Sequence, residues 1–324
     1  MWEALASDPS SRPKFDPMEP TTVVETARRA LGLAGVFLPF SRTSPASADQ
    51  QREAVRRLER AGCRSVWTNE GVGGKDALVQ LAVLLAVTER MVFGTAIANI
   101  WARAPQTAHG AAALLAQAYP DRFVLGLGVG YPHQAASVGR EFGPPVATMR
   151  DYLDQLTAPT QLPAPDVAYP KIIGANGPKM LALSGEIADG ALPAMTPPEF
   201  TAQARQLLGP DKLLVVGLAI VADADQNRAK AAARQQVAGR LGQPGTYAAT
   251  MARLGYSERE ITEVSDRLVD AIVGYGDAAA IAAKAREHLA AGADHVMVMP
   301  TGTDFAGGVD QLEQLAPALA QLNP

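Results

Sequence analysis

The sequence of 324 residues is poor in cysteine and histidine, and each shortage excludes a class of protein. Its one cysteine, Cys63, cannot form an internal disulfide and offers no cysteine-based zinc site. The histidines are scattered, at positions 109, 133, 288 and 295, without the spacing of a metal-binding pair. We therefore expect no bound metal, and the free thiol suits a reducing, cytoplasmic setting.

Two other features are missing. Lysine and arginine (29) do not outnumber aspartate and glutamate (33), so the net charge of −4 gives no positive surface for a nucleic acid. No run of 18 apolar residues occurs, and residues 1–32 lack the basic start and apolar stretch of a secretory signal. The expected partner is a small-molecule substrate, with no nucleic acid and no membrane.

What the sequence does contain is an alternation of short apolar runs with longer segments of helical periodicity. This alternation is typical of a parallel sheet covered by helices. Eight such units favour a (β/α)₈ TIM barrel over a doubly wound sheet, which more often has five or six strands. The predicted strands are Gly35–Phe40, Ser65–Thr68, Met91–Ile97, Phe123–Leu127, Lys171–Ala175, Gly190–Ala194, Leu213–Val221 and His295–Met299.

The segments between these strands predict alanine-rich helices. We expect an amino-terminal arm over residues 1–30 and one barrel domain over 31–324, with a helical insertion at about 223–272. Alanine-rich outer helices could also bury a homodimer interface. The predicted helices are Ala48–Ala61, Lys75–Val87, Gln106–Ala118, Val146–Leu156, Pro178–Ile187, Pro198–Leu208, Asp277–Ala291 and Val309–Leu322.

A TIM barrel holds its active site at the carboxyl ends of the strands, so the residues just after each apolar run are the candidates. Asn69 and Glu70 follow the second run, and Glu70 is a candidate for proton transfer or a solvated loop carboxylate. The third run continues to Trp101 before Arg103 and Pro105 end it. This stretch could hold a flat apolar cofactor or simply fill the barrel.

The fourth run ends in GLGVGYP, Gly126–Pro132, whose spaced glycines are similar to a dinucleotide fingerprint. That fingerprint needs a glycine where Tyr131 stands, so we reject it. Glycines at a strand end instead let a ligand or another backbone approach closely. His133, just beyond them, is a second candidate for proton handling.

The fifth run ends in GANGPKM, Gly174–Met180, a small-residue turn that leads into a helix beginning at Pro178. Free backbone amides at the start of a helix, with Lys179 in the first turn, suit a phosphate group. An ordinary strand-to-helix turn uses similar residues, so both interpretations stay open.

Taken together, these segments resemble the luciferase-like monooxygenase superfamily, and within it the oxidoreductases that use the deazaflavin coenzyme F420. The resemblance extends from about Leu31 to Met299. The segments that carry it include GVFLPF, SVWTNEGVGGKDAL, GTAIANIWARAP, AYPDRFVLGLGVG, KIIGANGPKMLALSGEIADG and DRLVDAIVGYGDAAAIAAKAREHLAAGADHVMV.

The resemblance implies a ring system held at the strand ends, in front of a bulge with a non-prolyl cis peptide bond at Ala96–Ile97. It also implies phosphate and ribityl contacts from Gly174–Pro178 and from Gly190. The cofactor-binding residues predicted from pattern and resemblance together are Asn69, Ala96, Ile97, Asn99, Gly128, Gly130, Gly174, Ala175, Asn176, Gly177, Pro178, Lys179 and Gly190.

The chain departs from the family at the proton-handling positions. Asn69–Glu70 stands where relatives often have an Asp-His pair, and Tyr131 stands where some have a glutamate. Our hypothesis is hydride transfer between F420 and a small organic substrate, with Glu70 handling the proton because an apolar ring would desolvate it. Tyr131 and His133 are the substitutes. The alternatives are an FMN-dependent monooxygenase served by a separate flavin reductase, and a cofactor-binding barrel without turnover.

Overall fold

The computed structural model describes residues 22–40, 45–242 and 247–322. Its parallel sheet closes on itself because β8 pairs with β7 along one edge and with β10 along the other. The predicted (β/α)₈ barrel is therefore confirmed. Its eight strands are β1 (Ala34–Phe37), β2 (Ser65–Thr68), β3 (Val92–Thr95), β5 (Phe123–Gly128), β6 (Lys171–Gly174), β7 (Gly190–Leu192), β8 (Leu213–Ala222) and β10 (His295–Pro300).

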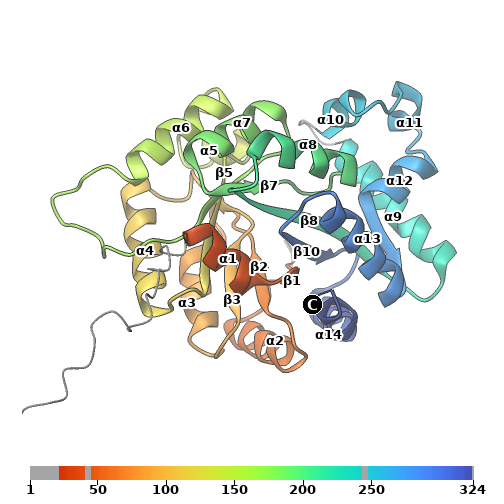
Figure 1. The fold of residues 1–324 in the computed structure, drawn as a ribbon, viewed down its shortest axis with the longest axis horizontal. Coiled ribbons are helices and arrows are strands. Elements are labelled where there is room, and N and C mark those ends of the chain that lie inside the picture. The colour runs from red at the N-terminus through yellow and green to blue at the C-terminus, as the bar shows by residue number, and fades with distance from the viewer. Residues whose placement is uncertain (1–21, 41–44, 243–246, 323–324) are drawn as a thin grey trace, which may run out of the picture.

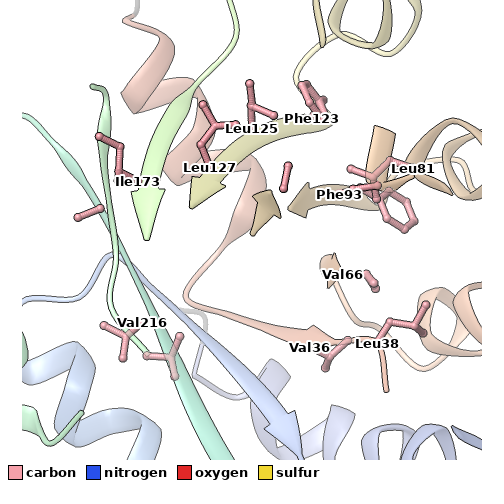
Figure 2. Packing of buried hydrophobic residues seen from close by; sticks show 14 of the residues in the cluster. Val36, Leu38, Val66, Leu81, Phe93, Phe123, Leu125, Leu127, Ile173 and Val216 are labelled. Atoms are coloured by element: carbon pink, nitrogen blue, oxygen red, sulfur yellow. The ribbon is translucent and has the colours of Figure 1, made fainter. Parts of the chain in front are cut away.

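Helices surround the barrel, as Figure 1 shows. Strand side chains alternate between the two faces of the sheet, and the outward ones, such as Phe93, Leu125 and Ile173, join the buried cluster beneath the helices (Figure 2). Several of these helices begin with proline in the first turn, where no amide is needed. The covering helices are α2 (Ala48–Arg60), α3 (Ala77–Leu85), α4 (Pro105–Ala118), α6 (Pro145–Leu156), α7 (Pro178–Ile187), α8 (Pro198–Leu208), α13 (Ala278–Ala290) and α14 (Phe305–Ala320).

The predicted strand Met91–Ile97 is interrupted by a bulge. Residues Val92–Thr95 form β3, and Ala98–Asn99 form a separate short strand, β4, that pairs with β5. The peptide bond between Ala96 and Ile97 is cis, which confirms the bond that the resemblance placed there. The bulge turns the chain at the carboxyl end of the barrel, beside Asn69 and Glu70.

The amino-terminal arm contains a helix. Its described part forms α1 (Val23–Leu31), which begins with a capping box between Thr22 and Glu25. The apolar face of α1 joins the cluster that fills the barrel interior. Arg28 of α1 pairs with Asp294 at 3.0 Å, just before β10. This helix therefore covers the amino-terminal end of the barrel and leaves the carboxyl end for the site.

His295 lies in the barrel core next to α1, with no solvent exposure. Its Nδ1 is 2.7 Å from the carbonyl oxygen of Gly32, while its Nε2 accepts a hydrogen bond from the indole of Trp67 at 3.1 Å. These contacts fit one neutral tautomer, with the proton on Nδ1. Burial lowers the pKa of His295 from 6.5 to about 4, so the folded protein keeps the imidazole neutral.

This environment predicts acid sensitivity. The unfolded chain takes up a proton at His295 below its ordinary pKa and the folded chain does not, so stability falls as the pH drops from about 6.5 toward 4. Between pH 7 and pH 5 this histidine should cost about 2 kcal/mol of unfolding free energy. Urea unfolding at both pH values checks it: His295→Gln should lose about that much less than the wild type. Equal losses in the two proteins would contradict the assignment.

A helical insertion follows β8. It comprises α9 (Gln226–Leu241), α10 (Tyr247–Arg253), α11 (Glu258–Thr262) and α12 (Asp266–Ile272), which lie to one side of the barrel in Figure 1. The chain returns to the barrel through β9 (Val273–Gly276), which pairs with the last four residues of β8. This strand was not predicted from the sequence. The amide of Asp223 donates to the carbonyl of Gly276 at 3.0 Å, so the two ends of the insertion are neighbours.

In the described part of the chain, no helix is both long and apolar enough to cross a membrane.

Candidate cofactor site at the carboxyl ends of the strands

The bulge residue Ile97 lies over two glycines of the neighbouring strands. A Cβ on Gly128 of β5 would stand 2.4 Å from the Ile97 side chain, and one on Gly174 of β6 would stand 3.2 Å from it. The glycines therefore leave the space that Ile97 occupies, and three predicted cofactor-binding residues meet at one place. We call Ile97, Gly128 and Gly174 the seat. It is a small apolar surface at the mouth of the barrel.

Directly beyond the seat, β6 passes into α7 through the predicted small-residue turn. Gly177 is the N-cap of α7 and has no side chain to bond the first amides, and Pro178 occupies the first helical position. A Cβ at Gly177 would meet no atom within 4 Å, so the turn is open. Lys179 is exposed in the first turn. An open helix start with free amides and a nearby cation can hold an anion.

Asn176 ties this turn to the next strand and to the insertion. Its Oδ1 accepts from the amide of Ala194 at 2.9 Å, and its carbonyl accepts from the hydroxyl of Thr250 at 2.9 Å. Ala175, by contrast, packs into the outer cluster beneath the helices. Asn176 therefore shapes the turn, while the side chain of Ala175 does not reach the mouth.

Glu70 is buried and hydrogen bonded on several sides. Its side chain is 1% exposed, its Oε2 accepts from the amide of Asn99 at 2.8 Å, and its Oε1 accepts from the amide of Ala77 at 2.9 Å. Its own amide donates to the carbonyl of Ile97 at 3.1 Å. Glu70 thus forms hydrogen bonds to both sides of the bulge, with the carbonyl of Ile97 and with the amide of Asn99.

The charge of Glu70 is matched by Arg103, which also pairs with Asp76 at 2.8 Å. Burial opposes the positive charge of Arg103, but the two carboxylates outweigh it and raise its pKa. Glu70 is therefore surrounded by a cation and backbone amides. From the sequence we instead expected it to lie beside the apolar ring of the cofactor. A buried carboxylate with this many hydrogen-bond donors around it holds the local structure together.

A second network joins the bulge to the loop after β5. The side-chain amide of Asn99 donates to Oε1 of Gln134 at 3.1 Å, and the same oxygen accepts from the amide of Tyr131 at 2.9 Å. Gly130 has φ +60°, and a Cβ there would stand 2.2 Å from that oxygen. Only glycine fits this turn, which fixes the backbone of Tyr131 at the mouth.

The side chain of Tyr131 is also held. Its ring stacks on His133, with centroids 5.8 Å apart and planes 10° from parallel. Its hydroxyl lies beside Arg240 of α9, whose guanidinium donates to the hydroxyl of Tyr247 at 2.6 Å. His133 itself is exposed on α5 (Pro132–Ala136). Of the two substitutes for proton handling, Tyr131 is the one whose polar group is held by a neighbouring side chain.

One predicted cofactor-binding residue, Gly190, lies apart from the others. Gly190 begins β7, where it pairs with Ile172 and Leu213 at the amino-terminal side of the barrel. A Cβ there would stand 2.0 Å from the carbonyl oxygen of Leu213, so this glycine allows close strand packing. It lies at the other end of β7 from the mouth. Asn69 and Ala96, in contrast, follow β2 and β3 at the mouth itself.

A cavity of about 550 Å³ lies next to this site but is not part of it. It is found between the start of α4 and α6, where Trp101, Arg140 and Tyr152 are among its lining residues. None of the seat residues lines it. Within the described residues, no group of three or more acidic, histidine or cysteine side chains is placed to hold a metal ion.

Several residues of this site were not among those predicted from the sequence: Asp76, Arg103, Gln134, Arg240, Tyr247 and Thr250. Asp76 could have been predicted as a helix N-cap, because aspartate is common just before a helical run such as ALVQL. It does cap α3. Arg240 and Tyr247 carried no such signal, because they are more than a hundred residues away from Tyr131 in the chain. Only the fold brings them to the mouth.

Comparison with known proteins agrees with this architecture. The chain is 30% identical over 178 residues to a protein of Mycobacterium tuberculosis described as a coenzyme F420-dependent oxidoreductase. That match covers 45% of this chain and about half, 51%, of the relative.

Two solved structures are similar over most of their length. One is an F420-dependent secondary alcohol dehydrogenase in complex with an F420–acetone adduct (TM-score 0.66, 18% identity, 89% of this chain and 98% of the other). The other is the oxygenating constituent of 3,6-diketocamphane monooxygenase of Pseudomonas putida in complex with FMN (TM-score 0.66, 14% identity, 90% and 98%). At these identities the likeness concerns the fold alone.

The family model for the luciferase-like monooxygenases matches residues 33–295, from the start of the barrel to its last strand. With the closed barrel and the bulge at Ala96–Ile97, this match assigns the chain to the luciferase-like monooxygenase family.

Proposed function

We propose that this protein is an F420-dependent oxidoreductase that transfers hydride between the deazaflavin and a small organic substrate. The observation that carries the proposal is the combination of the seat with the open turn at Gly177, adjacent at the mouth of the barrel. A flat ring needs an apolar surface without projecting side chains, and its phosphate needs free amides. The described residues supply both.

The predicted residues that lie at the mouth have roles that their positions support. Ile97, over Gly128 and Gly174, would back the ring, and residues 176–179 would hold the phosphate. Glu70 does not face the mouth, so we propose that it positions the bulge through Ile97 and Asn99. Tyr131 then becomes the group that handles the proton.

The cofactor, when bound, supplies or accepts the hydride. In the direction of reduction, the acceptor carbon of a carbonyl substrate gains that hydride and its oxygen gains a proton from the Tyr131 hydroxyl, which solvent restores. In the reverse direction, Tyr131 first gives its hydroxyl proton to solvent and then takes the proton of an alcohol, whose carbon gives up the hydride. The barrel end also holds both partners close together, which lowers the entropic cost of the transfer.

The second candidate is an FMN-dependent monooxygenase that receives reduced flavin from a separate reductase. The specific reason to keep it is the FMN-containing structure, whose TM-score equals that of the F420 enzyme. Both cofactors are planar and carry a phosphate, so the seat and the turn suit either of them.

Titration of the purified protein with F420 and with FMN, followed by the fluorescence of each ring, tests the proposal. We expect F420 to bind at least about tenfold more tightly than FMN, a difference of about 1.4 kcal/mol. Tight binding of FMN with no binding of F420 would reject the assignment in favour of the monooxygenase. Saturable F420 binding without oxidation of the reduced form by any of a panel of carbonyl and quinone acceptors would indicate a barrel without turnover.

A further inference from the structure

The insertion places a charged side chain at the mouth of the barrel. Arg240 lies near the end of α9 and Tyr247 begins α10, so neither belongs to the barrel itself. The guanidinium of Arg240 lies over the ring of Tyr247, 4.3 Å from its centroid, and donates to its hydroxyl at 2.6 Å. Tyr247 is 9% exposed, so this pair is a fixed part of the structure.

The same pair reaches the strand ends at two points. The hydroxyl of Tyr131, after β5, lies beside the guanidinium of Arg240. Tyr247 contacts Asn176 of the turn after β6, and Thr250 of α10 donates to the carbonyl of that asparagine. Burial opposes the charge of Arg240, but the hydroxyls of Tyr247 and Tyr131 outweigh it and raise the pKa. The guanidinium therefore stays charged beside Tyr131.

From this arrangement we infer that Arg240 is a positioning residue that orients the hydroxyl of Tyr131 for proton transfer. An arginine can only donate hydrogen bonds, so the oxygen of Tyr131 must accept from it. The hydroxyl hydrogen of Tyr131 is then directed away from the guanidinium and is free to bond a substrate oxygen. The inference rests on the proposed role of Tyr131, and it assigns a catalytic contribution to the insertion.

The backbone of Tyr131 is already fixed by Gln134, and its ring by His133. The direction of the hydroxyl hydrogen is what these contacts leave undetermined, because a phenol hydrogen can lie on either side of its C–O bond. Arg240 supplies the missing constraint. The residue should therefore matter for turnover and much less for cofactor affinity.

A double-mutant cycle tests this. Tyr131→Phe, Arg240→Gln and the double variant are compared in the oxidation of reduced F420 by the quinone menadione, with the F420 dissociation constant measured separately. We expect each single variant to lower kcat at least about tenfold, the double variant to lower it no further, and the dissociation constant to change less than about threefold. Arg240→Lys, which also can only donate, should recover part of the rate.

A matched control is available in the same insertion. Arg267 lies over the ring of Tyr256 at 4.4 Å and pairs with Glu260, so both of these contacts are made within the insertion. Arg267→Gln should leave kcat unchanged. Losses in the Tyr131 and Arg240 variants that multiply in the double variant would overturn the inference, because Arg240 would then act independently of Tyr131.

The same cycle measured by urea unfolding needs neither cofactor nor acceptor. A coupling of at least about threefold in the unfolding equilibrium constant supports the Tyr131–Arg240 contact, and no coupling overturns it. Failure of the wild type to bind F420 would refute the proposed function instead, and the unfolding cycle would still decide whether the contact exists.

Discussion

Glu70→Ala is expected to lower the free energy of unfolding by about 3–5 kcal/mol, because it leaves the buried guanidinium of Arg103 without its closest partner. It also removes the acceptor for the amides of Asn99 and Ala77. Urea unfolding followed by circular dichroism measures the loss. Glu70→Gln should lose less, since its amide oxygen can still accept from one of these amides.

An exposed ion pair provides the control. Asp49 pairs with Arg52 on α2, but its side chain is 90% exposed. Asp49→Ala should cost less than about 1 kcal/mol, as is usual for surface pairs. If Glu70→Ala proved as mild as Asp49→Ala, the carboxylate would not be holding the bulge together. A free Glu70 would then again be a candidate for proton handling.

Gly177→Asp should weaken F420 binding by about a hundredfold or more without destabilising the protein. A carboxylate a few ångströms away from a phosphate at a solvated site costs several kcal/mol of repulsion. The substitution is tolerated structurally, because φ is −147° at Gly177 and no atom lies within 4 Å of a Cβ there. Aspartate is also a better N-cap than glycine, so stability should rise by a few tenths of a kcal/mol.

A loss of F420 affinity together with a gain in stability would show that the added charge acts on the bound phosphate and does not damage the fold. Gly177→Ala is the matched control, since it adds the same Cβ without charge and should keep most of the affinity. Fluorescence titration measures the affinities, and thermal unfolding the stabilities. Wild-type affinity in Gly177→Asp would place the phosphate elsewhere and remove the main support for the role of this turn.

The sequence was informative where a single local rule determined the structure. The helices Pro178–Ile187 and Pro198–Leu208 were predicted with the observed bounds, because proline marks the first helical position of each. The eight strands followed from apolar runs between turn residues. The short strand β9, with the sequence VGYG, was missed because two glycines in four residues are not typical of a strand. Helix α1 could have been found from the spacing of Thr22 and Glu25.

The site was harder to predict, because its chemistry depends on which side chains meet. The position of Glu70 after a strand was predicted, but its pairing with Arg103, 33 residues later, was not. That pairing is the reason why we propose a structural role for Glu70 in place of proton transfer. The resemblance placed Gly190 among the phosphate and ribityl contacts, whereas its register with β8 puts this glycine at the amino-terminal end of β7.

The pairing of Asp223 with Gly276 means that the chain departs from the barrel and rejoins it at almost the same point. A segment whose ends meet in this way can change in length or sequence without disturbing how the barrel closes, because β7 pairs with the first two residues of β8 and β10 pairs with the edge of β8 opposite to β9. Exchanging residues 224–275 for the equivalent stretch of another member should therefore leave the barrel closed, while it replaces Arg240 and its neighbours.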